Sequence, residues 1–207
     1  MKIHRLSIAP VIDGKLEDTV WQEGNLLDGF TQFEPEMGKP ASEKTEVRVG
    51  YDAVNLYFGI RCFDSEPKKI FGGAMRADAD LSQDDSVTII LDTFLDRRNG
   101  FLLTVNPIGA RTDALLRNEG EEVNVDWDGL WDAATTRDSL GWTAEIAVPF
   151  KTLRFGRAID WTYRPGSDLF LVYNDVDDLD PVRRESGFSP LQPGRTITIK
   201  ATRRFDF

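Results

Sequence analysis

The chain has 207 residues, of which 41% are hydrophobic and 29% charged, and its formal net charge is −10. These values are typical of a soluble globular protein with one full domain and an appendage, and the acidic charge argues against nucleic acid as a partner, because phosphate binding needs a basic face. The single cysteine, Cys62, excludes an internal disulfide and a cysteine-rich zinc site, and the single histidine, His4, argues against a Ser–His–Asp or Cys–His catalytic centre.

Neither a membrane helix nor an export signal is visible in the sequence. No apolar run approaches the roughly 20 residues that a membrane helix needs. Residues 1–15 lack the apolar core of a signal peptide.

The first third of the chain combines one predicted helix with two clear strands. Apolar residues at helical spacing predict a short amphipathic helix over Lys15–Glu23. Alternating apolar residues predict strands over Thr45–Tyr51 and Asn55–Phe63, joined by a tight hairpin. Cys62 falls on the apolar face of the second strand, so we expect a buried, unreactive thiol.

The stretch Ala74–Asp96 is an acidic loop that runs directly into a buried strand. Val87, Ile89 and Leu91 alternate with other residues at the period of two that is typical of a strand. Carboxylates stand on both sides of it, at Asp78, Asp80, Asp84, Asp85, Asp92 and Asp96. Such a loop is either a solvated acidic loop or a calcium-stabilised rim beside a ligand site.

The next part of the chain continues the β pattern. Strands are predicted at Phe101–Asn106, Arg111–Leu116, Leu130–Thr136 and Trp142–Val148, with a second acidic loop at Asn118–Asp128. Short strands at regular spacing with almost no helix indicate an all-β sandwich, with eight to ten strands in residues 1–157.

The tail, residues 158–207, changes character. A hairpin is predicted with Asp160–Tyr163 as its first arm and Leu169–Asn174 as its second. Arg195–Phe207 alternates like a transmembrane barrel strand that ends on an aromatic residue. Two or three such strands cannot close a barrel. The tail must therefore add strands to the sandwich or stay partly disordered, and we place the boundary between the two parts at residues 157 and 158.

Several dispersed motifs resemble those of one known family. They are Ile12-Asp13-Gly14-Lys15-Leu16 with Trp21; Val49-Gly50-Tyr51-Asp52 with Leu56-Tyr57; Asp84-Asp85-Ser86-Val87 with Leu91-Asp92; Asn106-Pro107-Ile108-Gly109 with Asp113; and Gly141-Trp142 with Glu145 and Val148-Pro149-Phe150. Residues 8–157 with these motifs resemble carbohydrate-binding module family 9-like domains. The resemblance implies a jelly-roll-like β-sandwich related to DOMON domains, with a short β-hairpin or strand tail appended.

The resemblance also implies function and setting. Founding members bind the ends of sugar chains, are joined to glycoside hydrolases and contain structural calcium. The tail resembles the last strands of outer-membrane-barrel proteins of unknown function that carry this module at their N-terminus. A periplasmic, cell-envelope or extracellular location is implied, with outer-membrane association through the tail in longer relatives.

The sugar platform of the family does not carry over to this sequence. Ser82 stands where the sugar-binding members have a tryptophan, and Thr88 stands where they have a glutamate. Because sugar binding depends on aromatic stacking combined with hydrogen bonds to hydroxyl groups, the aromatic residues must come from elsewhere. Trp127 and Trp131 are the candidates, although core packing is the favoured alternative for Trp131.

Charged residues complete the candidate ligand site. Asp84 and Asp85 lie in the acidic loop, and Arg76 either binds a ligand through paired hydrogen bonds or neutralises nearby carboxylates.

Calcium is the expected cofactor. Asp78, Asp80 and Asp84 have the alternating oxygen spacing of a calcium loop. The helix-loop-helix motif is excluded because Gln83 replaces the required glycine, so any calcium site would be built differently.

A glycosidase would need a pair of carboxylates, and Asp84 or Asp85 with Glu145 are the candidates. Acidic residues are too frequent here for such a pair to be diagnostic, so no catalytic residue is assigned.

The favoured function is a non-catalytic carbohydrate-binding module for an oligo- or polysaccharide, acting as an accessory to glycoside hydrolases in carbohydrate catabolism. The alternatives are a structural or periplasmic interaction domain without a sugar site, and a glycosyl-bond hydrolase.

Overall fold

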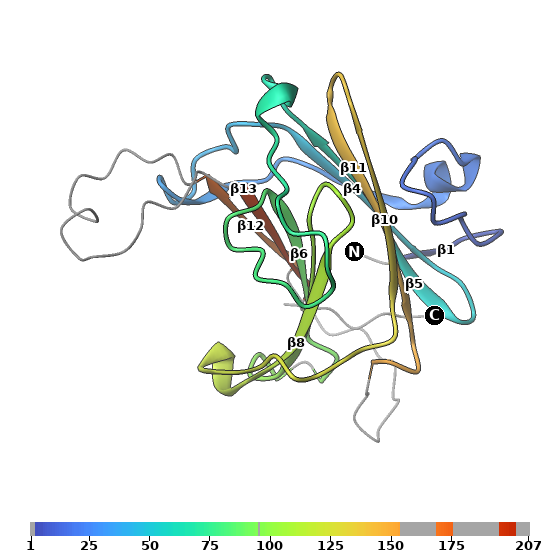
Figure 1. The fold of residues 1–207 in the computed structure, drawn as a ribbon. Coiled ribbons are helices and arrows are strands. Elements are labelled where there is room, and N and C mark those ends of the chain that lie inside the picture. The colour runs from blue at the N-terminus through green and yellow to red at the C-terminus, as the bar shows by residue number, and fades with distance from the viewer. Residues whose placement is uncertain (1–2, 95, 154–168, 176–194, 202–207) are drawn as a thin grey trace.

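The computed structural model describes residues 3–94, 96–153, 169–175 and 195–201. The predicted boundary at residues 157 and 158, the first arm of the tail hairpin and the final aromatic residue lie outside these ranges. The described chain forms two β-sheets that face each other as a sandwich (Figure 1), which confirms the predicted all-β fold class.

The first sheet has six strands in the order β1-β4-β5-β11-β10, with β2 also paired to β4. Its strands are β1 (His4–Arg5), β2 (Asn25–Leu27), β4 (Thr45–Tyr51), β5 (Asn55–Phe63), β10 (Asp132–Asp138) and β11 (Gly141–Pro149). In the centre, Val47 pairs with Ile60, and Ile60 pairs with Ala144. Their side chains are fully buried, so the predicted period-two pattern marks the face that packs on the other sheet.

The second sheet has seven strands in the order β3-β12-β13-β6-β7-β8-β9. Its strands are β3 (Gln32–Glu34), β6 (Ser86–Leu91), β7 (Gly100–Val105), β8 (Arg111–Arg117), β9 (Glu122–Asn124), β12 (Leu169–Asp175) and β13 (Arg195–Ala201). On its inner face, Val87 pairs with Val105 and Ile89 with Leu103, and all four side chains are fully buried.

The two described tail strands belong to this second sheet. β13 runs parallel to β6 over six paired residues and antiparallel to β12, which in turn pairs with β3. The tail therefore adds strands to the sandwich, which is one of the two outcomes that the sequence allowed.

Residues 6–24 cross the outer face of the first sheet. Leu6, Val20 and Trp21 form a second, smaller core there with Tyr57 and Ala147. The predicted helix Lys15–Glu23 is wrong in its extent, because only the 3-10 helix η1 (Thr19–Glu23) forms.

The physical reason lies in the residues before η1. Gly14 has a φ of +86°, and the backbone N–H groups of Asp13 and Gly14 donate to the Glu145 carboxylate at 2.9 and 2.8 Å. Inside the predicted range, Asp18 has an extended backbone (φ −60°, ψ 127°), and its carboxylate accepts from the N–H of Val11 at 2.8 Å, so the helix begins only at Thr19.

The predicted count of eight to ten strands in residues 1–157 is also wrong, because the part of this stretch that the structure describes already has eleven, β1 to β11. The additional strands are edge pieces of two or three residues, such as β1 and β9. A segment of that length has no measurable periodicity and becomes a strand only through its partner.

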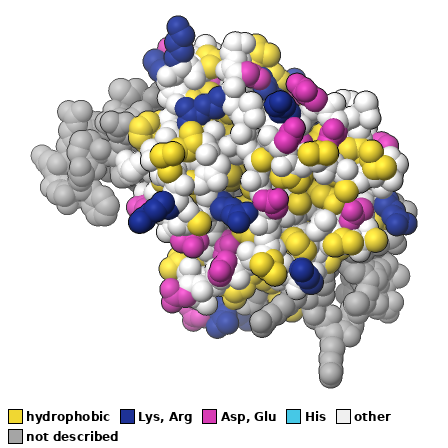
Figure 2. All heavy atoms as spheres, turned by 45° about the vertical axis from the view of Figure 1, so that its right-hand side comes forward, with side chains coloured by type: hydrophobic (Ala, Val, Ile, Leu, Met, Phe, Trp, Pro, Cys, Tyr) yellow, Lys and Arg dark blue, Asp and Glu magenta, His cyan; other side chains and the backbone are white. Residues whose placement is uncertain are grey.

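Charged side chains of both signs are scattered among the hydrophobic ones on the face shown in Figure 2. No helix of the described residues is both long and apolar enough to cross a membrane.

Candidate functional site

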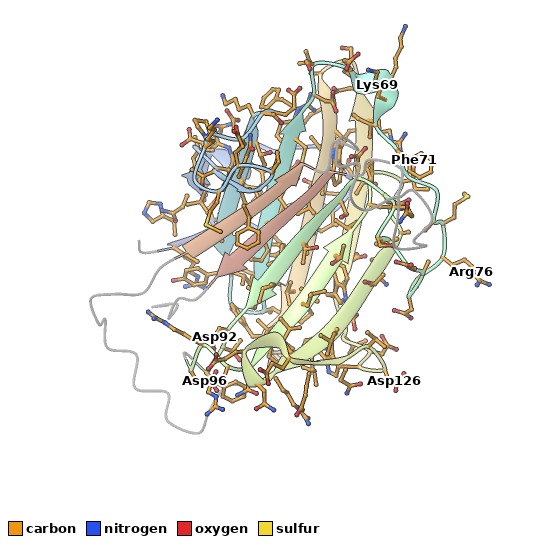
Figure 3. The ribbon with its side chains drawn as sticks, turned by 90° about the vertical axis from the view of Figure 1, so that its left-hand side faces the viewer. Lys69, Phe71, Arg76, Asp92, Asp96 and Asp126 are labelled. Atoms are coloured by element: carbon orange, nitrogen blue, oxygen red, sulfur yellow. The ribbon has the colours of Figure 1, made fainter. Side chains whose placement is uncertain are left out.

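The structure does not gather the predicted site residues in one place. Asp85 directly precedes β6 and Asp92 directly follows it, so six strand residues separate them, a span of roughly 20 Å. Figure 3 shows Phe71 toward one end, Asp92 and Asp96 at the other end, and Arg76 at the side between them. Trp127 lines a hollow with Asp96, so the structure does not bring it together with Asp84 and Asp85.

Asp84 and Asp85 hold the loop before β6 against the sheet. Asp84 is 2% exposed and accepts hydrogen bonds from the backbone N–H groups of Gly73 and Ala74 at 2.9 and 3.1 Å. Asp85 is 6% exposed and accepts from the N–H of Phe71 at 2.6 Å. Burial with these partners makes both carboxylates anchors of the loop.

Asn106 completes this arrangement. Its Nδ2 group donates to Asp84 Oδ2 at 2.7 Å, and its Oδ1 atom accepts from the N–H of Ala110 at 2.8 Å. One buried amide thus joins the loop before β6 to the turn between β7 and β8.

The other charged candidates are exposed on the same loop. Arg76, Asp78 and Asp80 are solvent-exposed, and Asp80 caps a local turn by accepting from the N–H of Ser82 at 2.9 Å. Within the described ranges, no group of three or more His, Cys, Asp and Glu side chains is arranged to hold a metal ion. The structure does not assemble Asp78, Asp80 and Asp84 into a ligand set, and calcium binding stays a prediction.

Trp131 is a core residue. Its side chain is buried, and its Nε1–H donates to Asp113 Oδ2 at 2.7 Å. The Arg111 guanidinium lies 5.4 Å from the centre of its ring. Core packing, the alternative favoured from the sequence, therefore describes this residue.

Trp127 is different, because its ring is half-buried and lines a surface hollow of about 280 Å³. The ring packs on Phe101 with a centroid separation of 5.1 Å and a tilt of 55°. We call this space the Trp127 hollow. Its lining residues come from the β6–β7 connection, β7, β8 and the second acidic loop: Phe94, Asp96, Asn99, Gly100, Phe101, Leu115, Leu116, Arg117 and Trp127.

Three polar side chains stand among the apolar ones in the Trp127 hollow. Burial opposes the charge of Asp96, but hydrogen bonds from the N–H of Arg98 and from Asn99 hold the pKa of Asp96 below its ordinary value. Arg117 is exposed and has no ion pair with another described residue. The Trp127 ring can stack on a sugar ring, and the carboxylate, amide and guanidinium groups beside it can form hydrogen bonds with the sugar hydroxyl groups.

Glu145 is not available as a catalytic partner. It is 0% exposed, and its two carboxylate oxygens accept hydrogen bonds from the Trp21 indole N–H at 2.8 Å and from the backbone of Asp13 and Gly14. Burial raises the pKa of Glu145 above its ordinary value, against the effect of these hydrogen bonds. The carboxylate fixes residues 6–24 on the first sheet.

Sequence reasoning missed most of the Trp127 hollow. Phe94 follows a strand and Arg117 is the last residue of β8, and neither has a distinguishing pattern, while Asn99 belongs to an Asn-Gly pair that predicts a hairpin turn but no ligand site. The only available signal was the antiparallel pairing of the predicted neighbouring strands, which places the end of one beside the start of the next.

Comparison with known proteins gives a family match and a shared fold. The model of the family described as carbohydrate family 9 binding domain-like matches residues 12–186, which is more than half of the chain and extends beyond residue 157. No curated protein matches the sequence.

Three solved structures share the fold. Two are structures of a carbohydrate binding module family 9 from Caldicellulosiruptor kristjanssonii, in complex with cellotriose and with glucose, each at 16% identity and a TM-score of 0.53. They cover 96% of this chain and 93% and 95% of the other chain, respectively. A candidate carbohydrate-binding protein from Bacteroides uniformis ATCC 8492 is 10% identical with a TM-score of 0.62, covering 96% of this chain and 98% of the other.

Proposed function

The chain belongs to the carbohydrate family 9 binding domain-like family, and on that premise we propose that it binds a saccharide in the Trp127 hollow. The observation that carries the proposal is the half-buried Trp127 ring in a hollow that also contains Asp96, Asn99 and Arg117. Trp21, Trp131 and Trp142 are all buried in the core. Trp127 is thus the one tryptophan of the described residues that can present part of its ring to a ligand.

The size and chemistry of the hollow support a small polar ligand. Its volume of about 280 Å³ lies just below the range of about 300–1,000 Å³ that is usual for small-molecule pockets. The ring of Trp127 offers a stacking surface, and the Arg117 guanidinium offers donors that match the oxygens of neighbouring hydroxyl groups. The two neighbours from Caldicellulosiruptor kristjanssonii, in complex with cellotriose and glucose, make these sugars the first ligands to test.

The decisive experiment is calorimetric titration of the whole chain with cellotriose, glucose and xylo-oligosaccharides. We expect binding by the natural protein that is lost in Trp127→Ala and weakened about tenfold in Arg117→Ala, as for the loss of one charged hydrogen bond. Phe71→Ala is the matched control, because Phe71 is an exposed aromatic residue near the opposite end of the sheet. Binding that survives in folded Trp127→Ala protein would place the sugar elsewhere. If the natural protein bound none of these sugars, an interaction domain would be favoured.

We also propose that the module is not itself a glycosidase. The distribution of its carboxylates supports this, because Glu145 is enclosed by the N-terminal segment while Asp84 and Asp85 anchor a loop of the other sheet. A glycosidase needs two carboxyl groups that flank one bond, about 5–9.5 Å apart. Release of reducing sugar by the purified chain would contradict the proposal.

An accessory role beside glycoside hydrolases in carbohydrate catabolism, a cell-envelope location and a structural calcium ion are further proposals. The family resemblance alone supports them. Calcium is tested by thermal unfolding in calcium and in chelator, where a higher melting temperature with calcium is expected from preferential binding to the folded state. Equal melting temperatures would remove calcium from the proposal.

A further inference from the structure

The Trp127 ring has no hydrogen bond of its own among those of the described residues, so its position depends on what surrounds it. One side packs on Phe101, which is buried in the core. The tip of its six-membered ring lies against Gly129, where an added Cβ would come 2.4 Å from Cη2 and 2.9 Å from Cζ2. Gly129 therefore acts as a second contact that fixes the tilt of the ring.

Asp113 in turn fixes Gly129. The carboxylate of Asp113, on β8, accepts the N–H of Gly129 at 3.3 and 3.4 Å and the Trp131 Nε1–H at 2.7 Å. The two donors are the second and the fourth residue after Trp127. One buried carboxylate thus ties the end of the second acidic loop to the sheet.

The bonds to Gly129 are long and the bond to Trp131 is short. The shorter bond holds the Trp131 side chain in the core. The longer bond, which the Gly129 N–H shares between the two carboxylate oxygens, keeps the backbone of Gly129 close to β8. Burial raises the pKa of Asp113 above its ordinary value, with contributions from the nearby charges of Asp128 and Asp78. Burial disfavours the charged form of Asp113, yet its hydrogen bonds are all directed at this loop. These contacts support a role in positioning the loop.

From these contacts we propose that Asp113 and Gly129 are the positioning residues of the binding site: Asp113 holds the loop, and the absent side chain of Gly129 lets the Trp127 ring lie in the hollow. Neither residue lines the hollow. The inference rests on the proposed function only where it concerns affinity, because the position of the ring is a property of the free protein.

Two substitutions separate the two parts of this arrangement. In Asp113→Asn, the amide oxygen can take the place of Oδ2 and accept from the Trp131 Nε1–H, but the amide nitrogen then replaces Oδ1 and turns its hydrogens toward the Gly129 N–H, which loses its 3.3 Å bond. In Gly129→Ala, the added methyl group must displace the Trp127 ring, and the φ of Gly129 is not in the left-handed region. Asp126→Asn is the matched control, because Asp126 is exposed in the same loop and loses the same charge.

The first measurement is iodide quenching of tryptophan fluorescence in the ligand-free chain, with Trp127→Phe subtracted to isolate the Trp127 signal. We expect the quenching and the near-ultraviolet circular dichroism of Trp127 to change in Asp113→Asn and Gly129→Ala and to stay unchanged in Asp126→Asn. The second measurement is calorimetric titration with cellotriose and glucose, where the first two variants should bind about tenfold more weakly or worse, and the control should bind normally.

The outcomes are distinct. Unchanged quenching in folded Gly129→Ala and Asp113→Asn overturns the inference, and so does normal affinity in both variants. The same inference stands if quenching changes as expected while the natural protein binds neither sugar. In that case it is the proposed saccharide site that fails.

Discussion

Replacing Glu145 by glutamine removes one of the two oxygens that hold residues 6–24 on the first sheet. The carboxylate accepts three hydrogen bonds, from the Trp21 indole and from the backbone of Asp13 and Gly14, at 2.8, 2.9 and 2.8 Å respectively. Glutamine keeps one acceptor oxygen, so its amide nitrogen must face at least one of these donors. A buried donor without a partner costs about 1–3 kcal/mol.

The expected loss in the free energy of unfolding is therefore about 1–3 kcal/mol for Glu145→Gln. For a chain of this size, 1 kcal/mol lowers the melting temperature by about 2–4 °C, so a decrease of about 2–12 °C is expected. Differential scanning calorimetry of the natural protein and the variant measures it. Glu17→Gln is the matched control, because Glu17 is an exposed carboxylate in the same segment.

The pH dependence adds a second test. Burial raises the folded-state pKa of Glu145 above its ordinary value of 4.5. A raised pKa means that the contribution to stability is fully present below the ordinary value and is lost as pH rises through the folded-state pKa. The difference in melting temperature between the natural protein and Glu145→Gln should thus grow as pH falls from neutral toward 4.5. An equal melting temperature for the two proteins, or a difference independent of pH, would refute the reasoning.

Three further predictions concern stability and reactivity. Asp84→Ala removes the acceptor of one hydrogen bond from the buried Asn106 amide and of two from the partly buried N–H groups of Gly73 and Ala74, and should cost about 1–3 kcal/mol. Proteolysis in residues 71–85 should become faster, and protease resistance equal to that of the natural protein would contradict this. Gly141→Ala places a methyl group 2.0 Å from the Cys62 carbonyl oxygen, at a φ of +139°. Chemical denaturation should therefore show that the free energy of unfolding falls by more than about 1 kcal/mol. The loss should be larger than for the control Gly38→Ala, where no atom lies within 4 Å of the added methyl group. Burial raises the pKa of the Cys62 thiol, so a thiol reagent at mildly alkaline pH should label it only after unfolding, and rapid labelling of the native protein would show that the thiol is accessible.

The strands were predictable because burial of one face leaves a period of two in the sequence. The predicted ranges Thr45–Tyr51 and Asn55–Phe63 agree with β4 and β5. The predicted helix Lys15–Glu23 was too long because Asp18 has an extended backbone and its carboxylate accepts from the N–H of Val11, so the helix begins only at Thr19. Helical spacing of apolar residues does not reveal a backbone conformation that is set by such a contact.

The candidate site was only partly predictable. Trp127 and Trp131 are four residues apart and look alike in sequence, yet one lines a hollow and the other donates to Asp113 from the core. Asp84 and Asp96 belong to the same acidic stretch, but β6 carries them to opposite ends of the sheet. Residue type identified the chemistry, whereas strand direction decided which groups meet.

The sequence by itself determined the all-β class, the inward faces of the main strands and the family resemblance, because these depend on alternation and local motifs. The tertiary structure decided that the described tail strands β12 and β13 join the second sheet, that buried carboxylates act as anchors, and that Trp127 faces a hollow beside Arg117. Each of these depends on pairing and packing between segments far apart in the chain, and the free energy of such contacts is set by the whole fold and not by any local stretch.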